Sequence, residues 1–297
     1  MKYAILTHGG AASPHVHSDG CVKAAESARS VLERGGDALE AALAATVILE
    51  DDPRFNAGTG SNLRFDGNTI EMDASVMTSD ARFGAVACIQ RVKNPILVAA
   101  KVMETPHLLL VGDGATQFAR AHRFPDYDPL TEKAQAKHAR AMAELRGQGD
   151  GDYAADAAPW LSIDWKSLWN FGAEAPFQDT VGAVVRDSQG RFAATASTGG
   201  TVYMLKGRVG DSPLMGCGVY AGPAGAVAAT GVGEEIVRRF LSKTVYDWLE
   251  EGIPAARAAQ RGIAKFPEIV DVGLLVASRD GQAIASNRNM ASALLVG

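Results

Sequence analysis

Residues 179–187 read Asp179-Thr180-Val181-Gly182-Ala183-Val184-Val185-Arg186-Asp187, an apolar run rich in β-branched residues. Such a run predicts a β-strand, and the turn signal Asp187-Ser188-Gln189-Gly190 predicts where it ends. A second run, from Arg191 to Ala196, follows the turn, so the two runs predict a β-hairpin. The first strand begins with a threonine that directly follows a long polar segment rich in alanine and glycine.

Thr180 stands where a threonine can act as a nucleophile. Cleavage of the peptide bond before it would make Thr180 a new amino terminus. Its hydroxyl would then be the nucleophile and its own α-amine the general base. Threonine is also a good strand former, so position alone favours a purely structural role. The motifs that follow in the sequence reverse this preference.

The composition is that of a soluble globular protein, and it narrows the classes of partner. The 297 residues are 47% hydrophobic and 21% charged, with a net charge of −5, and can bury one large core or two modest ones. The acidic balance disfavours nucleic acid as a partner, and no apolar run is long enough to span a membrane. Three widely spaced cysteines, Cys21, Cys88 and Cys217, favour reduced thiols and a cytoplasmic location.

Periodicity and turn signals predict grouped strands and grouped helices. A helix from Ala38 to about Glu50 begins at Asp37, with Glu40 in the capping-box position. Beyond the first hairpin we expect more strands, one long helix over residues 234–251, and a closing hairpin over residues 272–286. This grouping predicts two sheets with helices outside them, and with no GxGxxG motif after the first strand it disfavours a dinucleotide-binding fold.

Two more threonines stand beside glycines in the second half of the chain. Ser197-Thr198-Gly199-Gly200 ends the predicted hairpin, so we expect Thr198 near the same edge of the sheet as Thr180. Thr230-Gly231-Val232-Gly233-Glu234 joins a strand to a helix, where a hydroxyl and the first backbone N–H groups of the helix can form an oxyanion hole. Taken singly, Thr198 would be a turn hydroxyl and Thr230 a helix cap.

The segment Gly207-Arg208-Val209-Gly210-Asp211-Ser212-Pro213 carries charges that complement a free amino acid. Arg208 offers a cation for a carboxylate, and Asp211 offers an anion for an ammonium group. A surface salt bridge beside a turn is the alternative for this segment alone. The joint presence of these motifs after Thr180 favours a catalytic role.

Together the motifs resemble the N-terminal-nucleophile asparaginases, also called plant-type L-asparaginases or isoaspartyl peptidases. In the second half, the resemblance is carried by Gln178-Asp179-Thr180-Val181-Gly182-Ala183-Val184 and the three segments above. In the first half, it is carried by His8-Gly9-Gly10-Ala11, residues 51–58, Glu71-Met72-Asp73-Ala74 and Asn94-Pro95-Ile96. It covers nearly the whole chain apart from the linker and the last few residues.

The resemblance implies an α+β fold, a four-layer αββα sandwich of the Ntn-hydrolase type, made as an inactive precursor. Self-cleavage between Asp179 and Thr180 would give an α chain, residues 1–179, and a β chain, residues 180–297, that stay associated. The α chain would end in a flexible linker at about residues 147–179. The resemblance also implies a homodimer of such αβ units.

For catalysis, the resemblance implies that Thr180 attacks the side-chain amide of L-asparagine or a β-aspartyl peptide bond, and that water then releases L-aspartate. Thr198 would tune the nucleophile, and Thr230 with the Gly231 N–H would hold the oxyanion. No cofactor is implied for this chemistry.

For substrate binding, the resemblance implies that Arg208 binds the α-carboxylate of the substrate and Asp211 binds its α-ammonium group. Gly231 and Gly233 would also line the pocket. Asn56 resembles a residue that reaches into the site and supports maturation. A structural sodium ion is implied on the backbone carbonyls of Leu49, Glu50, Asp52, Phe55, Ala57 and Thr59.

Two departures from the family pattern leave the substrate open. Asp179 replaces the glycine usual in the asparaginase branch and is similar to the glycosylasparaginase branch, although Gln178 replaces the histidine of that branch. Only Gly273 remains of a glycine-rich run that usually begins the last hairpin, so the preference between asparagine and β-aspartyl dipeptides stays open. The alternatives are a glycosylasparaginase and an unprocessed amino-acid-binding protein.

Overall fold

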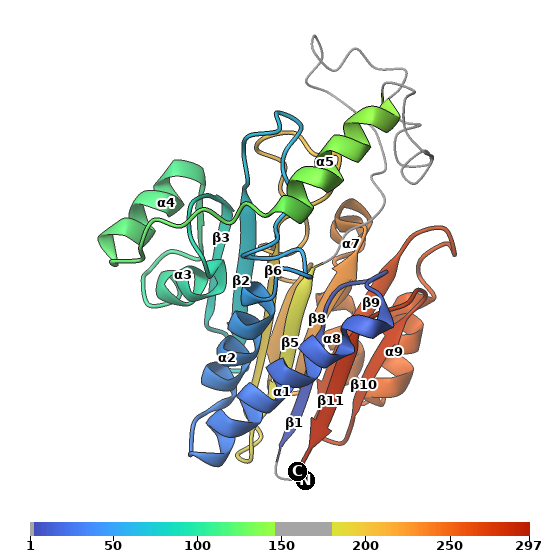
Figure 1. Cartoon of the computed structure of the whole chain (residues 1–297). Coiled ribbons are helices and arrows are strands. Elements are labelled where there is room, and N and C mark those ends of the chain that lie inside the picture. Colours follow the sequence, from blue (N-terminus) through green and yellow to red (C-terminus); the bar gives the residue numbers. More distant parts are fainter. Residues whose placement is uncertain (1–2, 146–179) are drawn as a thin grey trace.

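The computed structural model describes residues 3–145 and 180–297, in which two β-sheets lie face to face between layers of helices (Figure 1). The larger sheet has seven strands, in the order β11 (Ser292–Val296), β1 (Ala4–His8), β5 (Val181–Arg186), β6 (Phe192–Thr198), β2 (Met72–Thr78), β3 (Phe83–Ile89) and β4 (Leu109–Val111). The smaller sheet has four strands, in the order β10 (Gln282–Ser286), β9 (Val272–Ser278), β8 (Gly225–Gly231) and β7 (Val219–Gly222). Neighbouring strands are antiparallel except β3 and β4, which are parallel.

Helices cover the outer face of each sheet. The larger sheet carries α1 (Ser18–Glu33), α2 (Ala38–Asp51), α3 (Pro95–Val102) and α4 (Gly112–Ala121). The smaller sheet carries α7 (Gly233–Arg239), α8 (Leu241–Glu250) and α9 (Ala255–Ile263). A short 3₁₀ helix, His15–His17, directly precedes α1, and α5 (Glu132–Leu145) lies outside these layers (Figure 1). The order of the layers confirms the predicted α+β fold, a four-layer αββα sandwich (Figure 1).

The core is divided between the layers because strand side chains alternate between the two faces of a sheet. Val181 and Val185 of β5 pack with α1 and α2, whereas Val184 packs with Ala228 and Leu275 of the smaller sheet. Both faces of β5 are therefore buried, which explains why its sequence is apolar almost without interruption.

The hairpin that begins after Thr180 lies in the middle of the larger sheet. β5 pairs with β1 on one side, and β6 pairs with β2 on the other. Within the hairpin, Val181 pairs with Ser197. The predicted hairpin is confirmed, and strands from the first half of the chain hold it on both sides.

The predicted capping box of α2 is confirmed. The Asp37 side chain accepts a hydrogen bond from the Glu40 N–H (2.9 Å), and the Glu40 side chain accepts one from the Asp37 N–H (3.0 Å). This reciprocal pair satisfies two backbone donors that the first turn of a helix leaves without partners.

The single helix expected over residues 234–251 is wrong. α7 ends at Arg239, and Phe240 takes a left-handed conformation with φ 45° before α8 begins at Leu241. In one continuous helix, Ile236 and Leu241 would point about 140° apart. The break lets both pack in the same core, while Phe240 stays 61% exposed. No glycine or proline marks this break in the sequence.

A last strand, β11, follows the hairpin that the sequence predicts as the end of the chain. It pairs antiparallel with β1 at the edge of the larger sheet. Only Ala293 of its residues is buried, so its sequence lacks the alternation that marks a half-buried strand.

None of the helices in residues 3–145 and 180–297 combines the length and apolar character needed to cross a membrane. The linker predicted at 147–179, together with Gln178 and Asp179, lies outside the residues that the structure describes.

Candidate active site

Thr180 and Thr198 lie side by side at one end of the larger sheet. Thr180 immediately precedes β5, Thr198 is the last residue of β6, and the pairing of Val181 with Ser197 sets the two threonines opposite each other. Both threonines are buried. Thr198 Oγ1 accepts a hydrogen bond from the Gly200 N–H (3.0 Å), which leaves the hydroxyl proton of Thr198 able to donate to a neighbour.

Thr230 and Gly231 lie at the end of β8 in the other sheet. The Ala11 N–H donates to Thr230 Oγ1 (3.1 Å), so this bond connects the turn after β1 to the end of β8. Gly231 has φ 138°, and a Cβ added to it would lie 2.1 Å from the Asp271 carbonyl oxygen. Only glycine fits here without a shift of the backbone. With one lone pair of Thr230 Oγ1 engaged, its proton can point to a developing oxyanion.

Arg208, Asp211 and Gly233 converge on one small volume. A Cβ added to Gly233 would lie 3.0 Å from Arg208 Nη2 and 3.0 Å from Asp211 Oδ1. The Asp211 residue is 2% exposed, and burial raises the pKa of its carboxyl to about 7. A guanidinium and a carboxylate beside the same side-chain-free position can bind the two charges of an amino-acid head.

Two buried carboxylates lie close to the Arg208 segment: Glu71 directly precedes β2, and Asp73 is the second residue of β2. Glu71 Oε2 accepts hydrogen bonds from the Gly207 N–H (2.7 Å) and from Arg64 Nε (3.0 Å). Asp73 Oδ1 accepts one from the Cys88 N–H (2.8 Å), and burial raises the pKa of the Asp73 carboxyl. Glu71 therefore fixes the start of the segment that carries Arg208 and Asp211.

His8, which the sequence shows only as part of a family motif, lies beside the backbone of Thr180. It ends β1 opposite Gly182, and a Cβ on Gly182 would lie 2.6 Å from His8 Nε2. Burial lowers the His8 pKa to about 4, although an interaction with the Thr180 backbone raises it. Since Nδ1 accepts from the Gly10 N–H (3.1 Å), the neutral ring carries its proton on Nε2, near Thr180. The available signal was a histidine at the end of a buried strand, before two glycines.

Asn56 holds the segment that follows Thr198. Its Nδ2 donates to the Gly200 carbonyl, and its own carbonyl accepts a hydrogen bond from the Gly199 N–H (2.9 Å). Its Oδ1 accepts from the Asn62 N–H (3.0 Å). The structure therefore brings Asn56 beside the turn that carries Thr198.

The loop predicted to hold an alkali-metal ion brings several backbone carbonyls together. A Cβ on Gly60, which has φ 122°, would lie 2.5 Å from the Phe55 carbonyl oxygen and 2.8 Å from that of Pro53. The Glu50 carbonyl accepts from the Thr59 N–H (2.8 Å) and keeps a second lone pair. Such oxygens suit a hard cation. No group of three or more histidine, cysteine, aspartate or glutamate residues in the described ranges could hold a metal.

Glu50 also lies directly behind the threonine pair. Its Oε1 accepts hydrogen bonds from Ser197 Oγ (2.7 Å) and from the Ile96 N–H (3.0 Å). Burial raises the pKa of its carboxyl to about 8, so the group is mostly neutral at pH 7. The neutral carboxyl supports Ser197, the residue before Thr198.

Several buried polar atoms around these residues have no hydrogen-bond partner within the described part of the chain. They are His8 Nε2, Glu50 Oε2, Ser61 Oγ, Asp211 Oδ2 and Ser212 Oγ. Buried polar atoms are nearly always paired, so their concentration here indicates a place for a ligand or ordered water.

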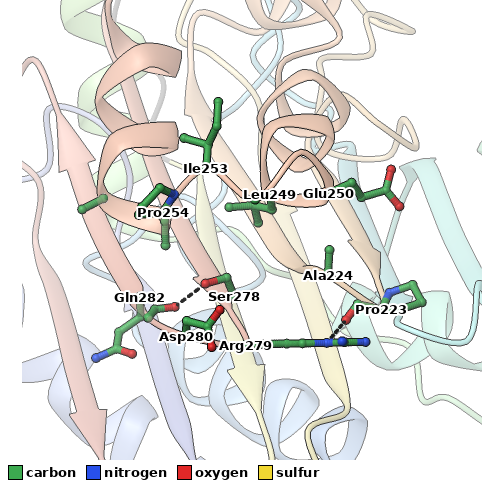
Figure 2. Close-up of a pocket in the computed structure, with 14 residues that line it drawn as sticks. Pro223, Ala224, Leu249, Glu250, Ile253, Pro254, Ser278, Arg279, Asp280 and Gln282 are labelled. Atoms are coloured by element: carbon green, nitrogen blue, oxygen red, sulfur yellow. Dashed lines mark hydrogen bonds between the residues drawn. The ribbon is translucent and has the colours of Figure 1, made fainter.

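A cavity of about 550 Å³ lies at the opposite end of the smaller sheet (Figure 2). It is lined by the β7–β8 turn at Pro223 and Ala224, the connection from α8 to α9, and the β9–β10 turn at residues 278–282. Ser278 pairs with Gly225 at one end of β8, whereas Thr230 stands near the other. None of the predicted site residues lines this cavity.

Comparison with known proteins places the chain in a family. The family model described as Asparaginase matches residues 1–295. The plant-type L-asparaginase of Pyrococcus furiosus is 41% identical over 272 residues, which cover 88% of this chain and 84% of the relative. The isoaspartyl peptidase/L-asparaginase of Homo sapiens is 38% identical over 297 residues, covering 96% and 90%, and that of Danio rerio is 35% identical over 298 residues, covering 95% and 87%.

These matches extend over almost the whole chain, and they agree with the two-sheet sandwich and with the motifs that meet at one end of it. The chain belongs to the asparaginase family of Ntn-type hydrolases that includes the plant-type L-asparaginases and the isoaspartyl peptidases.

Proposed function

We propose that this chain is an amidohydrolase that cleaves the side-chain amide of L-asparagine and the β-aspartyl bond of isoaspartyl dipeptides, and that it releases L-aspartate. The observation that carries the proposal is the meeting of Thr180, Thr198 and Thr230 with an Arg208–Asp211 pair at one end of both sheets. The names of relatives that are 35–41% identical support the same reaction.

The proposed enzyme is made as a precursor. Thr180 Oγ would attack the Asp179 carbonyl, and water would cleave the resulting ester, which frees the Thr180 amine. The Asp179 carboxylate would assist the shift, and Asp179→Ala should mature more slowly; an unchanged rate would refute this role. The products, residues 1–179 and 180–297, would stay together because β1 and β2 flank the hairpin of the second product.

In the mature site, Thr180 Oγ would attack the amide carbon while its α-amine takes the hydroxyl proton. The Thr230 hydroxyl and the Gly231 N–H would stabilise the negative charge that develops on the carbonyl oxygen. Thr198 would hydrogen-bond to the nucleophile. Ammonia, or the amine of the dipeptide, would leave, and water would then release aspartate from the acyl-enzyme.

The amino-acid head of the substrate would bind beside Gly231 and Gly233. Arg208 would donate to the α-carboxylate, and Asp211 would accept from the α-ammonium group. Every group in this chemistry comes from the protein, so the proposed reaction needs no cofactor. Asn56, which holds the turn after Thr198, would support maturation by fixing that turn.

A sodium ion would stiffen the loop at residues 49–60 without taking part in a chemical step. The carbonyls of Leu49, Glu50, Asp52, Phe55, Ala57 and Thr59 would hold it, and the convergence of carbonyls around Gly60 supports this. By resemblance we also propose a homodimer of αβ units.

We propose that the protein works in a reducing compartment such as the cytoplasm. The three cysteines of the chain are buried and form no disulfides, which supports this location.

The test is the release of ammonia and aspartate from L-asparagine, and of aspartate from a β-aspartyl dipeptide, by the purified chain. Thr180→Ala should be inactive on both substrates. Activity on a sugar–asparagine linkage alone would favour the glycosylasparaginase alternative instead. An uncut chain that binds aspartate without hydrolysing asparagine would favour a binding protein.

A further inference from the structure

Arg208 already has one carboxylate partner in the protein. Its Nε donates to Glu234 Oε1 (2.9 Å) and its Nη2 donates to Glu234 Oε2 (2.8 Å), a bidentate pair along one edge of the guanidinium. Burial of Arg208 lowers its pKa, but its interactions with Glu234, Asp73 and Asp211 together raise the pKa above the usual value. No step of the proposed reaction uses Glu234, the second residue of α7.

The pair leaves the other edge of the Arg208 guanidinium for a ligand. Nη1 has the Met204 sulfur at 3.6 Å, and a thioether is only a weak acceptor. Nη2 keeps a second hydrogen. The planar guanidinium, which donates to Glu234 from Nε and Nη2, can therefore also donate from Nη1 and Nη2 to a second carboxylate.

The Nη2 end of this remaining edge lies beside Gly233, as does the Asp211 carboxylate. Nη2 and Asp211 Oδ1 are both 3.0 Å from the point where a Cβ on Gly233 would stand. Gly233 directly precedes Glu234. The backbone beside the proposed position of the amino-acid head and the carboxylate that pairs with Arg208 therefore belong to the same turn at the start of α7.

We propose that Glu234 is a positioning residue for the α-carboxylate of the substrate. It holds the Arg208 guanidinium in one orientation. The Nη1–Nη2 edge can then bind the α-carboxylate without the entropic cost of ordering the Arg208 side chain on binding. It also neutralises part of the charge, so that Arg208, Glu234 and Asp211 together suit a zwitterionic head. This role rests on the proposed function.

The first test is Glu234→Gln, which keeps the size of the side chain but replaces one acceptor oxygen with an NH₂ group. Since the Glu234 side chain is 42% exposed, the variant should fold and mature like the wild type. We expect KM for L-asparagine to rise about tenfold, as for the loss of one charge-assisted hydrogen bond, while kcat changes less than about twofold.

Glu235→Gln is the matched control. Glu235 is the next residue of α7, and its carboxylate pairs with Arg238 and Arg239 instead of Arg208. The same charge is therefore removed from the same helix turn. KM for L-asparagine should stay within about twofold of the wild-type value, because the Glu235 pairs do not involve Arg208.

Product inhibition separates positioning from a general structural role. L-aspartate carries both head charges, whereas β-alanine keeps the ammonium group and the reacting carboxylate but lacks the α-carboxylate. In Glu234→Gln the inhibition constant of L-aspartate should rise about tenfold, and that of β-alanine should not change. A merely structural defect would weaken both inhibitors equally.

An unchanged KM in Glu234→Gln, or an equal loss for both inhibitors, would overturn the proposal. A lower KM would overturn it too, because Glu234 would then compete with the substrate for Arg208. If the wild-type chain releases no ammonia from asparagine at all, the proposed function fails before Glu234 is tested.

Discussion

The Ala11 N–H donates a hydrogen bond to Thr230 Oγ1 over 3.1 Å, and this one bond joins the end of one sheet to the end of the other. Both residues are buried. The bond occupies a lone pair of the hydroxyl and so directs its proton elsewhere. The two-sheet sandwich thus orients a donor before any substrate arrives, as electrostatic stabilisation of an oxyanion requires.

Removal of this donor should lower kcat with little effect on KM. Thr230→Val keeps the shape of the side chain but loses the hydroxyl, so we expect kcat for asparagine to fall by about 10²–10³. Thr230→Ser, which keeps the hydroxyl, should retain most of the activity. A Thr230→Val variant with wild-type kcat would show that the hydroxyl does not stabilise the transition state.

Asp211 should make substrate binding depend on pH near neutrality. Burial raises its pKa to about 7, so in the empty site the group is protonated below this pH and has no negative charge to pair with an ammonium ion. Below about pH 7, kcat/KM should decrease as the pH is lowered, by up to about tenfold for each pH unit. In Asp211→Asn we expect low activity without this acid limb. Identical pH profiles for the two proteins would contradict the assignment.

Glu50 should weaken the fold at alkaline pH. Its folded-state pKa is raised from 4.5 to about 8, so its neutral form favours folding fully below about pH 4.5, and this contribution is lost as pH rises through 8. Glu50→Gln keeps a neutral group and should melt near the wild-type temperature at pH 5 but above it at pH 9. Glu33→Gln, on an exposed residue of α1, is the control. Equal melting curves at pH 9 would refute a neutral Glu50.

A side chain on Gly233 should weaken binding of the amino-acid head of the substrate. A Cβ there would lie 3.0 Å from both Arg208 Nη2 and Asp211 Oδ1, so Gly233→Ala should raise KM by about tenfold or more. Gly114→Ala is the control, because a Cβ on that helical glycine meets nothing within 4 Å. Unchanged KM in Gly233→Ala would show that the amino-acid head binds elsewhere.

Local patterns in the sequence were enough to predict two sheets with helices outside them and the central hairpin, whereas the four-layer αββα sandwich was predicted from the resemblance to a family. β5 is apolar because both of its faces are buried, and the Asp37–Glu40 box sets the start of α2 through a strictly local exchange of hydrogen bonds. The break at Phe240 and the strand β11 escaped prediction because tertiary packing fixes them. No local signal marks the first, and the second gains its partner only from β1, at the other end of the chain.

The sequence points to the candidate site residues whose side-chain chemistry the proposed reaction requires. It does not point to residues whose role depends on what they contact in the folded chain. Thr180, Arg208 and Asp211 stand out by their chemical roles and by the glycines around them. His8 and Glu234 do not, since their importance comes from contacts with the Thr180 backbone and with the Arg208 guanidinium. Such contacts join residues far apart in the sequence, and no spacing rule reports them.

The most direct test of the central claim is the intact mass of freshly purified protein, followed over several days. We expect two fragments, residues 1–179 and residues 180–297, with Thr180 at the new amino terminus, and ammonia release that grows with the cleaved fraction. Thr180→Ala should remain whole. A wild-type chain that never cuts before Thr180, yet hydrolyses asparagine, would contradict the assignment of Thr180 as the nucleophile.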